Sequence, residues 1–345
     1  MKTFDLNTLV RENVKKMKPY SSARDEFQGT AAVFLDANEN PYASLYNRYP
    51  DPQQLGLKEK IGTLKKIAVD QIFLGNGSDE AIDLIIRAFC TPGKDNVIIP
   101  QPTYGMYSVS AEINDVEILT TTLTSDFNID IDSVLNIANV NSKILFLCSP
   151  NNPSGNLLSQ DKIKTILEKF NGLVVVDEAY IDFANQPSLT TWLKDYPNLL
   201  ILQTLSKAWG LAALRLGMCF ASVEIIKILN KIKPPYNINE ATQQLAIDHL
   251  SHVVQKEIWV KELIAQREIL KSGLEKLKLV IKVFPSDANF LLVKVIDPVG
   301  IYDQLIGQGI VVRDRSRIVL CDGCLRITVG TEKENELLIK ELSKL

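Results

Sequence analysis

The sequence has no apolar run that approaches the roughly 18 residues of a membrane-spanning helix. It also lacks an excess of positive charge, because 38 Lys and Arg are offset by 41 Asp and Glu. This balance argues against nucleic acid as a partner. Its first segment, MKTFDLNTLVRENVKKM, has no continuous apolar core of the kind found in secretory signals. These absences predict a cytoplasmic enzyme or small-molecule-binding protein with no membrane partner.

Cysteine and histidine are scarce, with five and two residues. An odd number of cysteines argues against a disulfide framework. The spacing of Cys321 and Cys324 suits zinc or redox chemistry, but no second pair accompanies it, and thiols in a reducing compartment are the favoured interpretation. His249 and His252 can be half of a metal site or part of a solvated helix face. We favour the helix face and predict no metal.

Short apolar runs alternate with helical patterns between about residues 31 and 240. Runs that are apolar on both faces are typical of strands covered by helices on both sides. Their alternation with helices predicts an α/β fold with a mainly parallel sheet in a large domain. The runs are NVIIP, KILFLCSP, LVVVDEAY, NLLILQ and LGMCFAS.

The last third of the chain predicts a smaller α+β domain. A helical stretch is expected over roughly 240–278, followed by strands and by a helix that begins at Thr331, with Glu334 in capping-box spacing. The expected strands are ANFLLVKV, IVVRD and CLRITVG. KIKPPYN interrupts the preceding pattern, and we divide the chain into an N-terminal arm (1–30), a large domain (31–235) and a small domain (236–345).

Polar residues follow several of the predicted strands, where ligands of parallel sheets bind. Lys207 follows NLLILQ. If its surroundings lower its pKa, the Lys207 amine can form a Schiff base with a carbonyl such as the aldehyde of pyridoxal phosphate (PLP). The alternative interpretation is an ordinary exposed lysine in a loop. Asp177 ends a buried run and needs a partner, which can be the PLP ring nitrogen, a helix end or Arg215. Tyr180 and Asn152 are then placed to donate hydrogen bonds to the phenolic oxygen of PLP.

A phosphate cradle is predicted where LGNGSDEAIDLIIRAF forms a turn that opens a helix, because free N–H groups at a helix start bind anions. The motif matches neither of the glycine-rich nucleotide motifs, so nucleotide binding is not supported. Tyr104 follows a strand and is suited either to stacking on a flat cofactor or to the core. The predicted phosphate ligands are Gly77, Ser78, Asp79, Ser206 and Arg215, with Thr204 beside them.

These motifs, in this order, resemble the fold-type-I PLP-dependent aminotransferases over nearly the whole chain. The matching elements are Asn152-Pro153-Ser154-Gly155, the Asp177 to Tyr180 segment, and Ser206-Lys207 followed by Arg215. Within that group the chain is most similar to the histidinol-phosphate aminotransferase family. That similarity is carried by LDANENP, NRYPDP, IRAFCTPGKD, PTYGMYSVSAE, TLSKAWGLAALRLG, PPYNIN and CLRITVGT.

The resemblance implies PLP on Lys207 and a homodimer with shared active sites, in which Tyr49 reaches the partner's cofactor phosphate. It also implies substrate contacts from Arg326 and Arg313, although Arg313 equally suits an exposed basic turn. Tyr20 of the arm would cover the substrate, and Asn38 and Asn237 are candidates for the imidazole ring.

The implied reaction is amino transfer between histidinol phosphate and 2-oxoglutarate, which gives imidazole acetol phosphate and glutamate, in histidine biosynthesis. An aromatic amino-acid aminotransferase is the nearest alternative, and a PLP-dependent decarboxylase of an amino-acid phosphate is another. A non-catalytic PLP-binding regulator is disfavoured because no DNA-binding module or basic patch is present.

Overall fold

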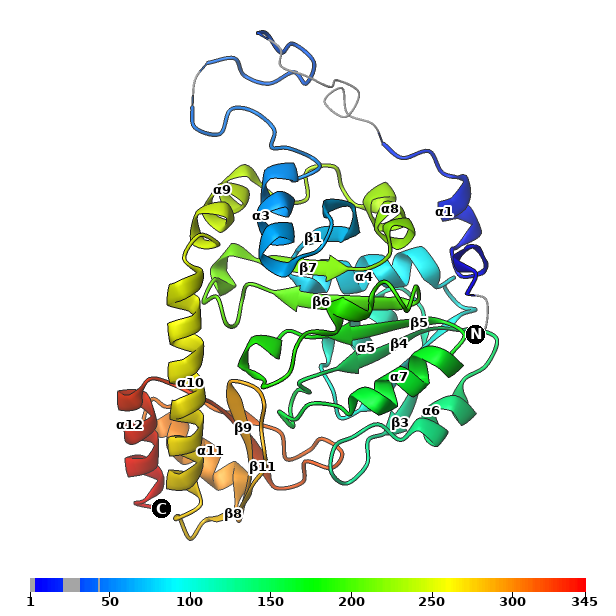
Figure 1. Cartoon of the computed structure of the whole chain (residues 1–345). Helices are drawn as coiled ribbons and strands as arrows, with labels where there is room; N and C mark the ends of the chain where they lie inside the picture. Colours follow the sequence, from blue (N-terminus) through cyan, green and yellow to red (C-terminus); the bar gives the residue numbers. More distant parts are fainter. Residues whose placement is uncertain (1–3, 21–31, 43) are drawn as a thin grey trace.

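The computed structural model describes residues 4–20, 32–42 and 44–345, and seven strands of these residues form a large central sheet (Figure 1). The strand order is β1-β7-β6-β5-β4-β2-β3. Neighbours from β6 to β3 are parallel, whereas β7 is antiparallel to both β6 and β1, so the predicted mainly parallel sheet is confirmed. The strands are β1 (Ile72–Asn76), β2 (Asn96–Gln101), β3 (Glu117–Thr122), β4 (Ser142–Cys148), β5 (Leu173–Asp177), β6 (Leu199–Thr204) and β7 (Leu216–Phe220).

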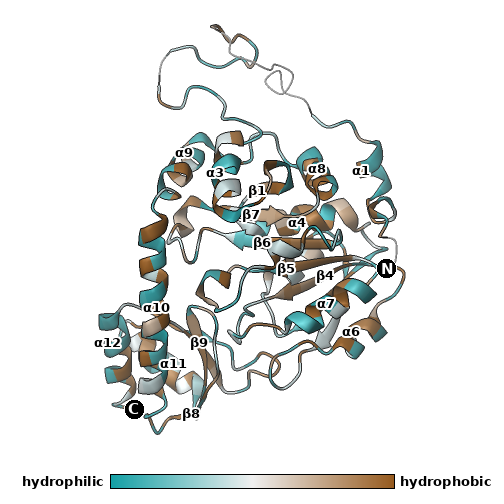
Figure 2. Cartoon of the chain, viewed as in Figure 1, coloured by the Kyte–Doolittle hydropathy of each residue, from teal (hydrophilic) through white to brown (hydrophobic). Residues whose placement is uncertain are grey.

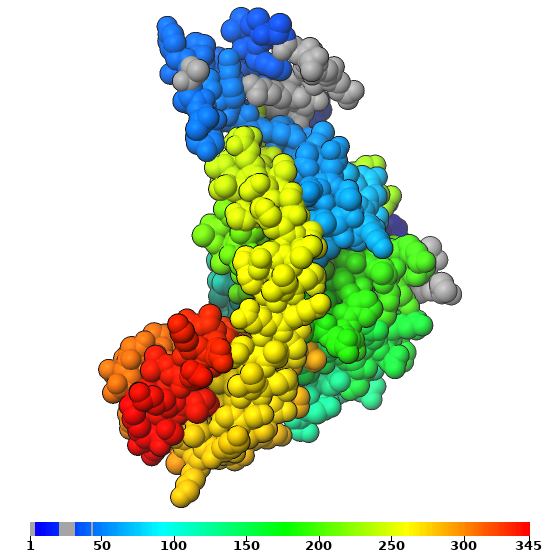
Figure 3. Space-filling view, turned by 60° about the vertical axis from the view of Figure 1, so that its left-hand side comes forward, coloured from blue at the N-terminus to red at the C-terminus, as the bar shows by residue number. Residues whose placement is uncertain are grey.

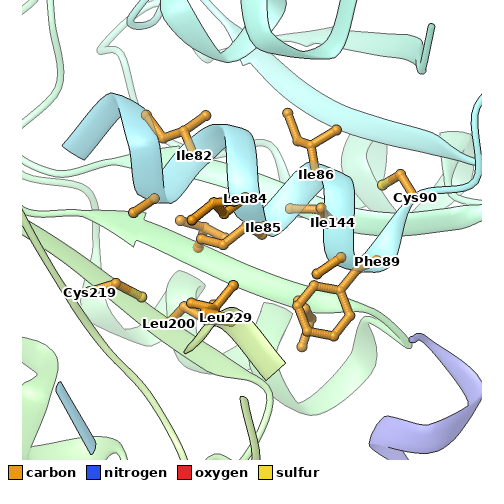
Figure 4. Close-up of a cluster of buried hydrophobic side chains, with 14 of the residues drawn as sticks. Ile82, Leu84, Ile85, Ile86, Phe89, Cys90, Ile144, Leu200, Cys219 and Leu229 are labelled. Atoms are coloured by element: carbon orange, nitrogen blue, oxygen red, sulfur yellow. The ribbon is translucent and has the colours of Figure 1, made fainter. Parts of the chain in front are cut away.

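The central strands are buried on both faces, as their apolar runs predict. Leu173 and Val175 of β5 face one hydrophobic cluster, and Val174 and Val176 face a second cluster on the opposite side. Figure 4 shows part of the first cluster, where apolar side chains of α4 lie over the strands. The labelled residues are Ile82, Leu84, Ile85, Ile86, Phe89, Cys90, Ile144, Leu200, Cys219 and Leu229.

Helices cover both faces of this sheet. Apolar side chains of α4 and α8 enter the first cluster, and those of α3, α7 and α9 enter the second. In Figure 2 the central strands are mostly brown, and the helices around them also carry hydrophilic teal surface. The helices are α1 (Glu12–Lys16), α3 (Leu55–Lys65), α4 (Ser78–Phe89), α5 (Met106–Ile113), α6 (Ile131–Ile137), α7 (Gln160–Lys169), α8 (Val223–Ile232) and α9 (Glu240–His249).

The segments on either side of the predicted domain boundaries share these clusters. Leu9, Val10 and Val14, from the predicted arm, are buried in the first cluster. Ala246 of α9, beyond the predicted boundary at residue 235, is buried in the second. The division into arm, large domain and small domain remains a prediction.

A second, smaller sheet lies at the far end of the long helix α10 (Val253–Leu274), which runs from the large sheet to the small one (Figures 1 and 3). Its strand order is β10-β11-β9-β8, with every neighbouring pair antiparallel. The predicted capping box of Thr331 and Glu334 is confirmed at the start of α12. The elements are β8 (Val280–Val283), β9 (Phe290–Val295), α11 (Pro298–Gly307), β10 (Arg313–Asp314), β11 (Cys324–Thr328) and α12 (Glu332–Leu342).

The helical stretch expected over 240–278 is two helices, because Leu250 ends α9 and His252 precedes α10. Short 3-10 helices connect other elements. They are η1 (Leu6–Thr8), η2 (Val69–Gln71), η3 (Ile181–Phe183), η4 (Leu189–Trp192) and η5 (Ala212–Leu214). Across the described ranges, no helix has both the length and the apolar character needed to cross a lipid bilayer.

Candidate active site

One pocket lies where the chain leaves β4, β5 and β6, at the carboxyl ends of these parallel strands. The turn before α4 and the residue before β7 complete it. All residues expected to hold a cofactor line this pocket except Tyr49. They are Gly77, Ser78, Asp79, Tyr104, Asn152, Asp177, Tyr180, Thr204, Ser206, Lys207 and Arg215. Cys148 and Ala179, which were not expected there, also line it.

Asp177 is the last residue of β5 and is only 3% exposed. Its Oδ2 accepts a hydrogen bond from the Tyr107 hydroxyl at 2.7 Å, and its Oδ1 accepts one from the Ala179 backbone N–H at 3.0 Å. Burial raises the pKa of Asp177 to about 6, although both hydrogen bonds act to lower it. Among the described residues no cation forms an ion pair with Asp177. A cationic ring nitrogen would therefore compensate a buried charge that the pocket leaves unpaired.

Lys207 follows β6, and its Nζ lies 5.6 Å from the centre of the Tyr180 ring. Burial and then the positive charge of Arg326 lower the pKa of Lys207, and the negative charge of Asp177 partly opposes them. A lower pKa increases the uncharged, nucleophilic fraction of the amine. This environment favours a reactive lysine over an ordinary loop lysine.

Asn152 connects the two sheets at the pocket. Its Nδ2 donates to the Tyr180 hydroxyl at 3.4 Å, and its Oδ1 accepts a hydrogen bond from Arg326 Nη1 of β11 at 2.6 Å. The Arg326 guanidinium also lies 5.3 Å from the centre of the Phe290 ring. Burial raises the pKa of Tyr180, so its hydroxyl remains a hydrogen-bond donor at neutral pH. The small sheet thus supplies an arginine to a site that is built on the large one.

The turn before α4 has the geometry expected of an anion site. Gly77 precedes the helix with a φ of 76°, and its N–H, which was expected to be free for an anion, donates to the Arg215 carbonyl at 2.7 Å. The Arg215 side chain lies 3.7 Å from Asp79, whose Oδ1 accepts from the Tyr104 hydroxyl at 3.1 Å. The start of α4 therefore faces the pocket beside a guanidinium, as a phosphate requires. The buried Thr204 hydroxyl accepts from the Ser206 N–H at 3.1 Å and orders the adjoining segment.

The remaining predicted residues lie outside this pocket. The Tyr49 ring stacks on Tyr236 with centroids 4.5 Å apart, and Tyr49 lines a separate hollow together with Asn38. Tyr20 is 71% exposed. Arg313 is exposed and pairs with Arg326 in the register of β10 and β11.

The amide of Asn237 is held within the protein. Its Nδ2 donates to the Leu74 carbonyl at 2.9 Å and to Glu80 at 3.1 Å. Its Oδ1 accepts from Gln54 at 3.3 Å. This set of contacts gives Asn237 a structural part in joining the PPYNIN segment to β1 and α4.

Two predicted features stay apart from the pocket. Cys321 and Cys324 are buried against apolar side chains, and burial raises the pKa of the Cys321 thiol to about 12. His249 and His252 lie at the junction of α9 and α10. Within the described part of the chain, no three His, Cys, Asp or Glu side chains are grouped so that they could hold a metal ion.

The donor set of the pocket fits PLP. An amine of lowered pKa can hold the aldehyde, a buried unpaired carboxylate can hold the ring nitrogen, and the start of α4 with Arg215 can hold the phosphate. The Asn152 amide and the Tyr180 hydroxyl are within reach of each other and can hold the phenolic oxygen together.

Comparison with known proteins agrees with this fit. The family model of aminotransferase class I and II matches residues 26–342. The chain is 54% identical over 343 residues to a histidinol-phosphate aminotransferase of Cytophaga hutchinsonii, covering 98% of this chain and 99% of that one. Its fold superposes on the histidinol-phosphate aminotransferase of Clostridium acetobutylicum with a TM-score of 0.79 at 26% identity, over 86% and 90% of the two chains.

A third similarity concerns the fold alone. The histidinol-phosphate aminotransferase of Sinorhizobium meliloti, solved in complex with pyridoxal 5′-phosphate, superposes with a TM-score of 0.78 at 21% identity, over 86% of this chain and 82% of that one. The family match and the identity along the full length together establish the relationship. The chain belongs to the class I and II aminotransferases.

Proposed function

We propose that this chain transfers the amino group between histidinol phosphate and 2-oxoglutarate, with PLP as cofactor, in histidine biosynthesis. The observation that carries the proposal is the meeting of Lys207, Asp177 and Asn152 at one pocket, with Arg326 hydrogen-bonded to Asn152. The full-length identity to proteins named histidinol-phosphate aminotransferase supports the choice of substrate. A biosynthetic role also suits the cytoplasm, where free thiols such as those of this chain stay reduced.

Bound PLP supplies an electrophilic carbon and an electron-withdrawing ring. The protein supplies the groups that direct this chemistry. Lys207 Nζ is the nucleophile and the base that takes the proton from the substrate carbon bearing the amino group. Asp177 holds a positive charge at the ring nitrogen, because its buried carboxylate is ionised above a pKa of about 6. Tyr180 and Asn152 donate toward the phenolic oxygen.

Arg326 is the best placed group for the anion of the substrate. It comes from the small sheet, reaches Asn152 and is only partly exposed. A guanidinium binds a phosphate or a carboxylate with the same two-pronged geometry. One side chain can therefore serve histidinol phosphate in one half-reaction and 2-oxoglutarate in the other, with Arg313 as a second candidate.

A homodimer completes the proposed site. Large apolar side chains are exposed on the segment before α3, which projects from the body in Figure 3, and along α9 and α10. Such surface is typical of a protein interface. Tyr49, at 49% exposed, would reach the partner's cofactor phosphate. The exposed apolar residues are Val33, Leu35, Tyr42, Leu45, Tyr46, Leu245, Val254, Ile258 and Trp259.

Mixing two inactive variants tests this arrangement. Lys207→Ala and Tyr49→Ala damage different components of the same shared site. In a hybrid dimer one site receives the intact Lys207 of one subunit and the intact Tyr49 of the other. Random exchange of subunits should therefore restore about a quarter of the original activity. If the mixture stays as inactive as its components while affinity capture of a tag on one variant also recovers the other variant, Tyr49 does not act across the interface.

Substrate preference tests the activity. We expect kcat/KM with 2-oxoglutarate to be higher for histidinol phosphate than for phenylalanine. The opposite preference would make the protein an aromatic aminotransferase, and CO₂ release without an oxo-acid would make it a decarboxylase. Borohydride treatment of the PLP-loaded protein should add a pyridoxyl group to Lys207, detected by peptide mass. Lys207→Ala should abolish this adduct.

A further inference from the structure

The chain segments that follow Tyr180 and Lys207 leave the pocket and meet at the same part of α10. Tyr180 is followed by η3, and Lys207 is followed by Ala208 and Trp209. Side chains of both segments pack in one buried cluster with α10 and with β9 of the small sheet. The cluster consists of Tyr180, Phe183, Ala208, Val260, Ala288 and Phe290.

Lys256 lies one helical turn before Val260 and contacts both segments. Its Nζ is 2.9 Å from Asp182 Oδ1, in the middle of η3, and 5.5 Å from the centre of the Trp209 ring. The side chains of Lys256 and Asp182 are only 9% and 17% exposed. A charge pair in such surroundings is held firmly, because removal of one partner leaves a poorly solvated charge.

Lys256 contacts residues that closely follow Tyr180 and Lys207 in the chain. Asp182 is two residues after Tyr180, and Trp209 is two residues after Lys207. We propose that Lys256 is a positioning residue, whose ammonium group holds these two segments against α10 and so fixes the Tyr180 hydroxyl and the Lys207 amine relative to each other. This inference rests on the proposed function for the reaction that it serves.

Lys256 acts in this proposal through position and not through its electric field on the pocket. The charges that alter the pKa of Lys207 come from other side chains, namely Arg326, Asp177, Arg215 and Asp79. Two further charged side chains lie next to the Lys256–Asp182 pair. Glu257 is 2.7 Å from Lys256, and Lys65 is 4.0 Å from Asp182. These two lysines and two acids nearly cancel in charge.

The test compares Lys256→Met, which keeps a long apolar side chain but removes the charge, with Lys333→Met at an exposed position of α12. Lys256→Arg should restore the behaviour of the original protein, because it keeps the cation. Asp182→Asn breaks the same pair from the other side with little change in size. Melting temperature is measured for all four variants, to report any general loss of stability.

Two readouts do not depend on turnover. Hydrogen exchange of the cofactor-free protein should become roughly tenfold faster over 178–184 and 207–211 in Lys256→Met and Asp182→Asn. In the PLP-loaded protein, the apparent pKa of the cofactor absorption band should rise by about half a unit or more, because the donors to the phenolic oxygen are less well placed. Lys333→Met should leave both unchanged.

Steady-state kinetics gives a third readout. We expect kcat to fall roughly tenfold while KM stays within about twofold, since misplacement of reacting groups acts on the chemical step. A lower melting temperature with unchanged hydrogen exchange, absorption and kcat would mean that the Lys256–Asp182 pair is merely structural, and would overturn the inference. Failure of both Lys256→Met and Asp182→Asn to fold would overturn it as well. If the original protein itself does not turn over histidinol phosphate, the proposed function fails, and exchange and absorption still decide this inference.

Discussion

The hydroxyl of Tyr107 donates a hydrogen bond to Asp177 Oδ2 at 2.7 Å, and both side chains are buried. Tyr107 comes from α5, and its ring is fixed by stacking on Phe146 of β4 at 4.8 Å between centroids. A donor to a carboxylate favours its charged form. The contact therefore holds the pKa of Asp177 below the value that burial alone would produce.

Tyr107→Phe should make cofactor binding more sensitive to acid. Loss of the hydroxyl removes one of two donors to Asp177, so its pKa should rise above about 6. Affinity for PLP depends on the ionised carboxylate and is lost as the pH falls through this pKa. We expect the midpoint of that loss, measured by titrating the cofactor-free protein at several pH values, to move up by about one unit.

Tyr302→Phe, in α11 and away from the pocket, is the matched control and should leave the midpoint unchanged. An unaltered midpoint in Tyr107→Phe as well would mean that the hydrogen bond contributes nothing to the ionisation of Asp177.

Asp177→Asn should stabilise the cofactor-free protein while it abolishes activity. The pKa of Asp177 is raised from 3.8 to about 6, which corresponds to a cost of roughly 3 kcal/mol when the carboxyl is ionised. Because the folded-state pKa is the higher one, this cost is absent below about pH 4, grows through pH 6 and is complete above it. Asparagine removes the charge but loses part of the hydrogen bonding, so we expect a net gain of about 1–2 kcal/mol at pH 7.5.

Urea unfolding at pH 7.5 and at pH 5 measures this gain, which should be smaller at the lower pH. Asp303→Asn, an exposed position on α11, should change the free energy of unfolding little at either pH. A gain that is equal at both values would show that ionisation of Asp177 is not its cause.

The sequence predicts the centre of the large sheet better than its edges. The apolar runs of β4, β5 and β6 are buried on both faces, so composition alone identifies them. By contrast, β3 is an edge strand with alternately exposed threonines, and β1 is a short edge strand that contains a glycine. The part-exposed β3 carries a weaker apolar signal. The first four residues of β1 are buried, but its apolar run is only three residues long before Gly75. Neither was expected, and the same holds for the short β8.

The pocket was foreseen where its residues lie in contiguous motifs that follow strands. Tyr107 was not, because its contact with Asp177 joins residues 70 positions apart and depends on how α5 packs on the sheet. Cys148 ends β4 beside Asp177, and no sequence motif assigned it to the pocket. The roles of the substrate residues, which rest on resemblance, remain predictions.

Arg326→Met should weaken both half-reactions. The guanidinium is the expected partner of the phosphate of histidinol phosphate and of a carboxylate of 2-oxoglutarate. Loss of a charged hydrogen-bonding partner costs about 2–3 kcal/mol, so kcat/KM should fall roughly 30- to 150-fold for each substrate. Pre-steady-state mixing of each form of the cofactor-loaded enzyme with one substrate measures the two separately.

Arg326→Lys should recover little, because an ammonium cannot form the two-pronged contact. Arg317→Met, at an exposed position nearby, should retain both activities. If Arg326→Met impairs only one half-reaction, two separate anion sites serve the two substrates.

Gly217→Ala should displace the phosphate turn. Gly217 lies in β7 directly under this turn, and a Cβ there would overlap the backbone of Gly77 and Ser78. The strand cannot move away, because Gly217 is paired with Gly75 of β1 on one side and Thr204 of β6 on the other. The turn must shift instead, and its N–H groups leave the geometry that binds phosphate. We expect affinity for PLP to fall more than roughly tenfold, with a loss of about 1–3 kcal/mol in stability from overpacking.

Gly307→Ala is the matched control, since no atom lies within 4 Å of a Cβ at this last residue of α11. Alanine there should leave PLP affinity unchanged and stabilise the fold by up to about 1 kcal/mol, because glycine loses more backbone entropy on folding. Fluorescence titration with PLP and thermal unfolding measure both variants. The added methyl group must displace the turn before α4. If Gly217→Ala and the original protein bind PLP with equal affinity, the phosphate does not bind at this turn.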